Sequence, residues 1–185
     1  MTEEAPIASP AEVVKFWTEA GPERWFNKDD AFDAEIRRRF LATHEAAAPG
    51  KLAEWESSAE GALALLILLD QFPRNMFRGS ARAFATDAQA RAITAGALLR
   101  GFDAQVPTKL RAFFYLPFEH SEDMADQERC IALYTAVGDD DGLKWATLHA
   151  DIIHRFGRFP HRNAVLGRTT TPKEQEFLDG GGFAG

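Results

Sequence analysis

The sequence has little of several residue types, and each shortage excludes a class of protein. Cys130 is the one cysteine among 185 residues, so no disulfide can form within the chain. The longest uninterrupted apolar stretch, residues 62–69, is far shorter than the roughly 20 residues that a membrane-spanning helix needs. Residues 1–10 have early acidic residues and no apolar run, which predicts no secretory signal or transit peptide. We therefore expect a cytoplasmic protein with no membrane partner.

Positive charge is also in short supply. The 21 Lys and Arg are outnumbered by 28 Asp and Glu, which gives a net charge of -7, and 15 Phe stand against 2 Tyr. The negative charge repels a phosphate backbone, and Phe is more typical of an apolar core than of a surface that stacks on bases. Both features disfavour nucleic acid as a partner. The sequence also lacks the motifs GxxxxGK[ST], GxGxxG, GxSxG and HExxH, which mark phosphate, dinucleotide, hydrolase and zinc sites. We expect neither a cofactor nor a bound metal.

Helix-forming residues dominate what is present. Ala occurs 31 times whereas Val and Ile together occur 12 times, and no stretch shows the sustained alternation of a strand. Three capping boxes are predicted, at residues 9–12, 57–60 and 171–174. We predict an all-α fold of about eight helices packed in antiparallel pairs. A single domain should cover residues 1–185, with flexible tails at 1–8 and 180–185.

Apolar patterning indicates which residues these helices bury. Residues 61–69 are apolar on all sides, which predicts a helix surrounded by others. Apolar stripes along 130–137 and 145–156 each require a neighbouring helix. His149 lies beside the second stripe, so we interpret it as a hydrogen-bonded histidine at the edge of the core. Cys130, on the first stripe, is interpreted as packing rather than as a nucleophile.

Arginine is concentrated in two places, against the acidic sign of the whole chain. Residues 154–168 contain four arginines and no acidic residue. A second group recurs at four-residue spacing: Arg74, Arg78 and Arg82. A guanidinium group can donate two parallel hydrogen bonds to a carboxylate or phosphate, so these arginines suit a small anion or an acidic peptide. The alternative is that carboxylates of the chain itself, such as those in 119–126, pair with them internally.

Two similar short sequences accompany these arginines. Residues 72–75 (FPRN) and 159–163 (FPHRN) are both interpreted as corners at which a proline ends a helix. Helix breaks free backbone and side chains to face a ligand. We therefore predict that the two corners lie near each other and near Glu119 and His120, and that together they form one mixed-charge pocket.

Glu119 and His120 form the second candidate for chemistry. They lie between a helix expected to stop at Pro117 and one expected to begin after Ser121. A carboxylate beside an imidazole that titrates near neutral pH could act as a general acid and base. The alternative is that the polar residues here only cap the following helix.

Five sequence runs resemble a family of uncharacterised bacterial proteins, the domain of unknown function 924. The runs are 13–17 (VVKFW), 24–26 (RWF), 69–75 (LDQFPRN), 114–123 (FYLPFEHSED) and 158–163 (RFPHRN). They occur in order, and the resemblance extends from about residue 13 to residue 178. It implies an all-helical, tetratricopeptide-like fold in a right-handed array, and it implies no activity, substrate or catalytic residue. One departure is Lys173, where the family resemblance leads us to expect an acidic residue.

Three functions remain open from the sequence. The first is a cytoplasmic helical scaffold that binds a small anionic ligand or an acidic peptide. The second is a hydrolase or transferase in which Glu119 and His120 transfer protons while arginines hold the substrate's negative group. The third is a structural or protein-interaction module without a ligand pocket, and a homo-oligomer is also left open. The candidate ligand-binding residues are Asp70, Arg74, Arg78, Glu119, His120, Arg158, His161 and Arg162.

Overall fold

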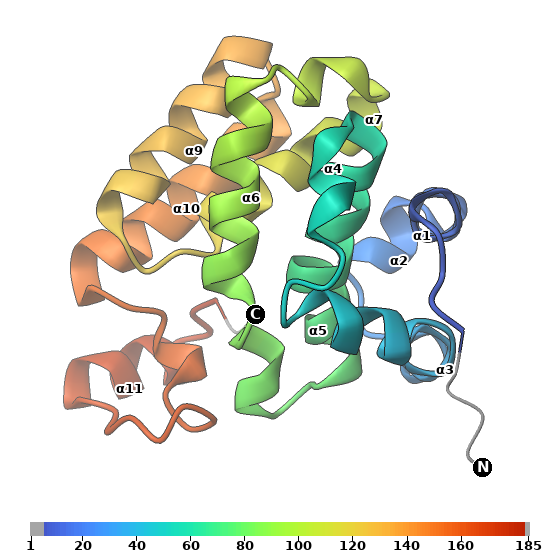
Figure 1. Cartoon of the computed structure of the whole chain (residues 1–185). Helices are drawn as coiled ribbons and strands as arrows, with labels where there is room; N and C mark the ends of the chain where they lie inside the picture. The colour runs from blue at the N-terminus through green and yellow to red at the C-terminus, as the bar shows by residue number, and fades with distance from the viewer. Residues whose placement is uncertain (1–5, 184–185) are drawn as a thin grey trace. The chain divides into compact units, whose positions relative to one another are not determined.

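The protein is all-α, as its sequence predicts. The computed structural model describes residues 6–183, and no strand occurs within that range. The helices, shown in Figure 1, are α1 (Pro10–Ala20), α2 (Pro22–Trp25), α3 (Asp30–Ala47), α4 (Ala59–Leu66), α5 (Phe72–Met76), α6 (Asp87–Leu99), α7 (Thr108–Arg111), α8 (Leu116–Glu119), α9 (Met124–Val137), α10 (Asp140–Phe156) and α11 (Pro172–Asp179). Four of these, α2, α5, α7 and α8, are single turns. Within the described range, no helix is long and apolar enough to cross a membrane.

The chain groups into two compact units, which are described separately. Unit 1 contains residues 1–78 and 82–117, and unit 2 contains residues 79–81 and 118–185. The single domain stays a prediction, as does the right-handed tetratricopeptide-like array. It is also still a prediction that the first corner, in unit 1, lies near the second corner, in unit 2. The outer parts of the expected tails, residues 1–5 and 184–185, lie outside the described range.

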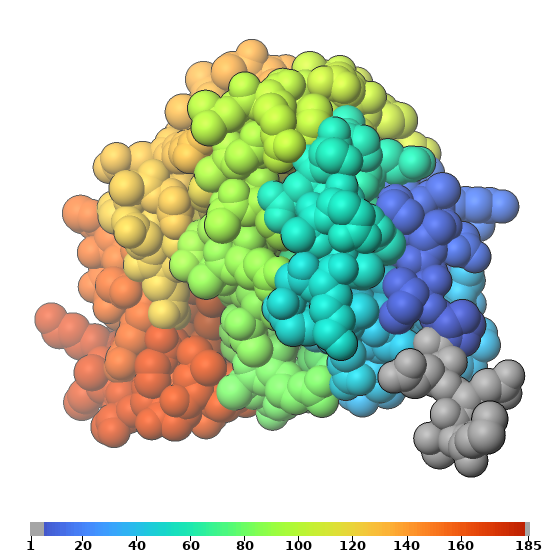
Figure 2. Space-filling model, in the orientation of Figure 1, coloured from blue at the N-terminus to red at the C-terminus, as the bar shows by residue number. Residues whose placement is uncertain are grey.

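Unit 1 is organised around the apolar segment 61–69, and the prediction of a surrounded helix is confirmed. Every residue of this segment is buried. Helix α4 packs against α1 and α6, and α4 and α6 lie side by side in Figures 1 and 2. Burial of so many Leu, Ile and Ala side chains supplies most of the stability of a helix this apolar.

Two of the three predicted capping boxes are confirmed, those at 9–12 and 171–174. The prediction at 57–60 is wrong, because Ser58 rather than Ser57 caps α4 and no reciprocal box forms. The reason is that a 3₁₀ turn, η1 (Ala53–Ser57), precedes the helix. The Ser57 hydroxyl is part of that turn and donates to the carbonyl of Glu54.

The first corner is not the end of a helix, and that prediction is also wrong. The chain continues from α4 through a π-helical turn, η2 (Ile67–Gln71), directly into α5. Pro73 has no N–H to donate to the carbonyl of Leu69, four residues earlier. The N–H of Phe72 bonds to the carbonyl of Ile67, five residues earlier. The carbonyl of Leu68 therefore has no backbone donor either.

Side chains from distant parts of the sequence satisfy the two carbonyls that this turn leaves without backbone donors. The ring nitrogen Nδ1 of His44 lies 2.9 Å from the carbonyl oxygen of Leu68, and the hydroxyl of Thr86 donates to the carbonyl of Leu69. Burial lowers the pKa of His44, so the ring is neutral near pH 7. Because a carbonyl only accepts, the proton of that ring is on Nδ1.

Unit 2 contains an antiparallel hairpin of α9 and α10, which run side by side in Figure 1. Gly138 ends α9 in the left-handed conformation, with φ of 70°, and Asp139 caps α10. A Cβ atom at Gly142 would lie 2.2 Å from the Tyr134 ring, so glycine at this position is what allows the two helices to approach.

The stripe predicted along 145–156 is buried only in part. Trp145 is 49% exposed and Leu148 is 37% exposed. The buried face of α10 instead includes Ala146 and Ala150. Small side chains on this face, together with Gly142, allow closer packing against α9 than large ones would.

Candidate functional site

Arg74, the first predicted anion anchor, lies among carboxylates inside unit 1. Its guanidinium makes two hydrogen bonds to Asp87, each 3.0 Å long, and lies 3.3 Å from Oδ1 of Asp70. Both aspartates are buried. Burial acts to lower the pKa of Arg74, but the charges of Asp70 and Asp87 outweigh it and raise that pKa. This geometry favours the alternative of internal pairing for Arg74.

Arg78 also pairs within unit 1, but at the surface. Its Nε and one terminal nitrogen contact the carboxylate of Asp33 in α3. Asn75 donates to the same carboxylate at 2.7 Å. Asn75 of the FPRN sequence and Arg78, just beyond α5, thus attach this segment to α3 through one shared aspartate.

Arg158 is engaged in the same manner in unit 2. It makes hydrogen bonds of 2.6 and 2.8 Å to the two carboxylate oxygens of Glu174, which is buried. Asn163 donates to Glu174 as well, as does the backbone N–H of Thr171. The hydrogen bonds from Arg158, opposed by burial and supported by Thr171, lower the pKa of Glu174 to about 2.

A second ion pair holds the other side of the FPHRN corner. Arg168 donates to both carboxylate oxygens of Glu122, at 2.7 and 3.0 Å, and Glu122 also accepts the backbone N–H of Phe159. Burial acts to raise the pKa of Glu122, but the hydrogen bonds from Arg168 and Phe159 outweigh it and lower that pKa. Arg168 further donates to the side chain of Asn163.

The second corner does meet the Glu119–His120 segment within unit 2. Arg162 is buried, donates to the carbonyl of His120 at 3.0 Å, and stacks 4.6 Å above the ring of Phe159. The ring of His161 also contacts Phe159, with 5.7 Å between the ring centroids. The planar guanidinium here holds a backbone carbonyl and an aromatic face together.

Glu119 faces a histidine that the sequence analysis placed elsewhere. One of its carboxylate oxygens lies 3.2 Å from Nδ1 of His149, and the other accepts from the thiol of Cys130 at 3.9 Å. Nδ1 of His149 also lies 2.8 Å from the carbonyl of Trp145, so this nitrogen carries the proton. All three side chains in this Glu119–His149–Cys130 cluster are buried.

The surroundings of this cluster determine its chemistry. Burial, reinforced by the charge of Glu119, raises the pKa of Cys130, so the thiol stays protonated and is a poor nucleophile.

The helix before this segment, α8, ends in side-chain hydrogen bonds. Gln127 donates to the carbonyls of Phe118, Glu119 and Ser121 and so satisfies the end of α8. Pro117 lies in the first turn of α8 and does not end a helix, which corrects the prediction for this junction.

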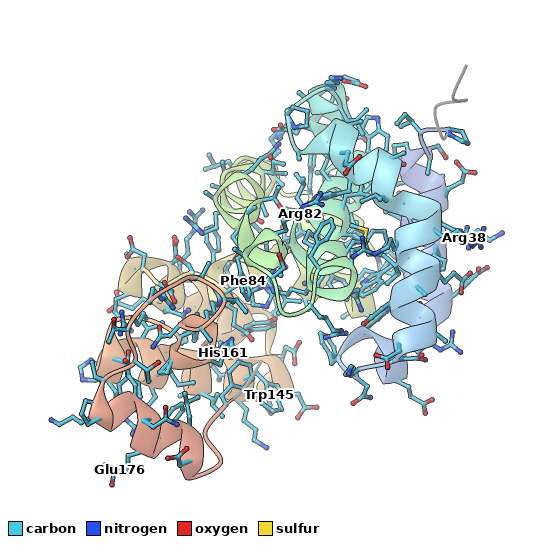
Figure 3. All side chains as sticks on the ribbon, turned by 90° about the horizontal axis from the view of Figure 1, so that it is seen from below. Arg38, Arg82, Phe84, Trp145, His161 and Glu176 are labelled. Carbon is cyan, nitrogen blue, oxygen red and sulfur yellow. The ribbon has the colours of Figure 1, made fainter. Side chains whose placement is uncertain are left out.

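Unit 2 also has a groove that the sequence analysis missed. It is open to solvent, has a volume of about 770 Å³, and lies between the end of α10 and α11. Its lining residues are His154, Arg155, Phe156, Lys173, Glu176, Phe177, Gly180, Gly181 and Gly182. We call this the α10–α11 groove. Figure 3 shows Glu176 on the outer side of α11.

Aromatic rings and cations line the α10–α11 groove. The rings of Phe156 and Phe177 are 5.1 Å apart, and the guanidinium of Arg155 lies 4.9 and 5.1 Å from their centroids. Arg155 also makes an exposed pair with Asp151 at 3.4 Å. Lys173 has no ion-pair partner in the part of the chain that the structure describes. The sequence signal for this groove was Lys173, which stands where the family resemblance leads us to expect an acidic residue.

The structure therefore distributes the predicted site residues over both units. Three lie in unit 1: Asp70, Arg74 and Arg78. Five lie in unit 2: Glu119, His120, Arg158, His161 and Arg162. Among residues 6–183, no group of three or more His, Cys, Asp or Glu side chains is arranged to hold a metal ion.

Comparisons with known proteins agree with the resemblance seen in the sequence. The family model described as "Bacterial protein of unknown function (DUF924)" matches residues 13–182. The solved structure of a protein of unknown function from Agrobacterium tumefaciens is 50% identical, with a TM-score of 0.90. The match covers 92% of this chain and 97% of that one. The comparison with curated proteins gave no match.

Proposed function

Because this chain belongs to the DUF924 family of bacterial proteins of unknown function, we propose a function from its own geometry. The protein is a cytoplasmic helical scaffold that binds a small anionic ligand or an acidic peptide. The binding site is the α10–α11 groove of unit 2. The predicted anchors Arg74, Arg78 and Arg158 serve mainly to hold the fold, because each already pairs with a carboxylate.

The observation that carries this proposal is the charge of the groove. Two cationic side chains, Arg155 and Lys173, line it together with the imidazole of His154 and the single acidic Glu176, in a chain of net charge -7. Arg155 shares its charge with Asp151 in an exposed pair, so Lys173 is the principal anchor for an anion. A cluster of cations attracts an anion most strongly where few carboxylates of the chain compete for it. The rings of Phe156 and Phe177 form an apolar surface for the rest of the ligand.

The test is a thermal-shift titration with phosphate, citrate and a glutamate-rich peptide. A ligand of the folded state at about 100 times its Kd stabilises by about 2.7 kcal/mol and so raises Tm. Lys173→Glu should abolish the rise while leaving the fold intact, because an acidic residue suits the first turn of α11. The matched control is Lys144→Glu, an exposed lysine of α10 outside the groove. No rise with any probe, or an equal rise in K173E, would refute the proposal.

Proton transfer is the second candidate function, and the Glu119–His149 contact is what favours it. The sequence suggested His120 as the partner of Glu119, but a carboxylate oxygen 3.2 Å from Nδ1 of His149 offers a better defined pair. A buried carboxylate–imidazole pair is a common feature of catalytic sites as well as of cores. A protein-interaction module or a homo-oligomer stays a prediction.

A further inference from the structure

Helix α10 exposes a stripe of side chains along one side. The middle of the stripe is apolar, because Trp145 and Leu148 lie three residues apart and both are exposed. Exposed apolar residues that occur singly are common on protein surfaces, but tryptophan is enriched in interfaces. We call this stripe the α10 face, and the helical period places on it Asp141, Lys144, Trp145, Leu148, Asp151 and Arg155.

The charges of the α10 face are arranged with opposite sign on the two sides of Leu148. Asp141 precedes Leu148 by seven residues, and Arg155 follows it by seven. Lys144 precedes it by four residues, and Asp151 follows it by three. At about 1.5 Å per residue, the outer two charges lie about 10 Å from Leu148 and the inner two about 5 Å. Each charge therefore has an opposite charge at a similar distance on the other side.

These charges are available to another molecule. Among the residues that the structure describes, Asp141 and Lys144 make no ion pair. Asp151 and Arg155 pair with each other at 3.4 Å, and both side chains are exposed. An exposed pair of this kind contributes little to the fold, so its charges can also serve an interface.

The pattern is complementary to itself when two copies of the helix run antiparallel. A two-fold axis at Leu148 brings Asp141 of one copy to Arg155 of the other, and each contact occurs twice. The same axis brings Lys144 close to Asp151 of the other copy. A parallel arrangement would place like charges together. Antiparallel helices also bring the positive end of each helix dipole to the negative end of the other.

We propose that the α10 face is the interface of a homodimer, in which the two α10 helices pack antiparallel about a two-fold axis at Leu148. Trp145 and Leu148 form its apolar centre, and the charges set its register. One helix from each copy makes a small interface, so we expect a Kd in the micromolar range. Lys173, the principal anchor of the α10–α11 groove, takes no part, so dimerisation and anion binding can fail independently.

Sedimentation equilibrium of the whole chain, at about 1 to 500 µM protein, measures the Kd of the dimer. The dimer should weaken as salt is raised, because salt screens exposed charges. Leu148→Glu should give a monomer at every concentration, since two carboxylates would then meet at the axis. The matched control is Thr147→Glu, which adds the same charge at an exposed position outside the α10 face and should retain the dimer.

A charge exchange tests the antiparallel register. Asp141→Lys and Arg155→Glu should each raise the Kd by about tenfold or more, because each brings like charges together at two symmetric contacts. The double variant D141K/R155E exchanges the two charges and should restore the Kd to near the wild-type value. Glu128→Lys, an exposed position of α9, makes the same change of net charge as D141K and should retain the dimer.

A second exchange guards against a local effect of R155E, which also removes the contacts of Arg155 with the rings of Phe156 and Phe177. Lys144→Glu and Asp151→Lys should each weaken the dimer, and the double variant K144E/D151K should restore it. Circular dichroism of each variant checks that the helices are intact.

Three results would overturn the proposal. A chain that stays monomeric up to the highest concentration has no such interface, whatever covers the α10 face. A dimer that L148E does not weaken uses another surface. If neither double variant dimerises more tightly than its single variants, the helices do not pack in the antiparallel register.

Discussion

At the residue scale, Arg74 and Arg78 are four residues apart, yet their pairs differ in burial. The side chain of Arg74 is 21% exposed and pairs with Asp70 and Asp87, which are 1% and 9% exposed. Arg78 is 39% exposed. Removing one partner of a buried ion pair strands the remaining charge in a medium of low dielectric constant. Solvent and salt screen the surface pair.

Arg74→Leu should therefore lower the free energy of unfolding by about 3 to 5 kcal/mol, the range for breaking a buried pair. Arg78→Leu is the matched control and should cost about 1 kcal/mol or less. Chemical denaturation of the two variants measures both values. Equal losses, or an undiminished stability in R74L, would contradict the internal role assigned to Arg74.

At the element scale, the π-turn η2 depends on donors that lie far from it in the sequence. Thr86→Val keeps the shape of the side chain but removes the hydroxyl that satisfies the carbonyl of Leu69. Leaving a buried acceptor unsatisfied costs about 1 to 3 kcal/mol. Thr86→Ser retains the hydroxyl and is the control. Urea unfolding of both variants gives the comparison, and an equal stability would mean that Thr86 does not support the turn.

The same element shows why local structure was only partly predictable from the sequence. Helix starts whose cap lies within four residues, such as Ser9 and Thr171, were predicted correctly because donor and acceptor are encoded together. Pro73 signalled a lost backbone donor, but not that His44 and Thr86 would replace it. Without that tertiary information, the end of a helix was the natural prediction.

At the scale of the whole molecule, composition predicted the fold class because Ala content, caps and periodicity all favour helices. The candidate site was harder to predict. Whether an arginine forms an internal ion pair or is available to a ligand depends on which carboxylate the fold places beside it. Glu174 is 16 residues from Arg158, and Asp33 is 45 residues from Arg78. The ring contacts of Phe183 with His149 and His161 join three separate segments, so no local pattern marked them.

The single domain predicted from the sequence has a direct test, because each compact unit contains its own probe. Trp17, Trp25 and Trp55 lie in unit 1, whereas Cys130, the sole cysteine, is fully buried in unit 2. In a Trp145→Phe variant, tryptophan fluorescence reports unit 1 alone, and labelling of the thiol reports unit 2. If the chain unfolds as one domain, the two signals should have the same midpoint in urea, since a two-state transition is independent of the probe. Separate midpoints would instead identify two domains that unfold independently.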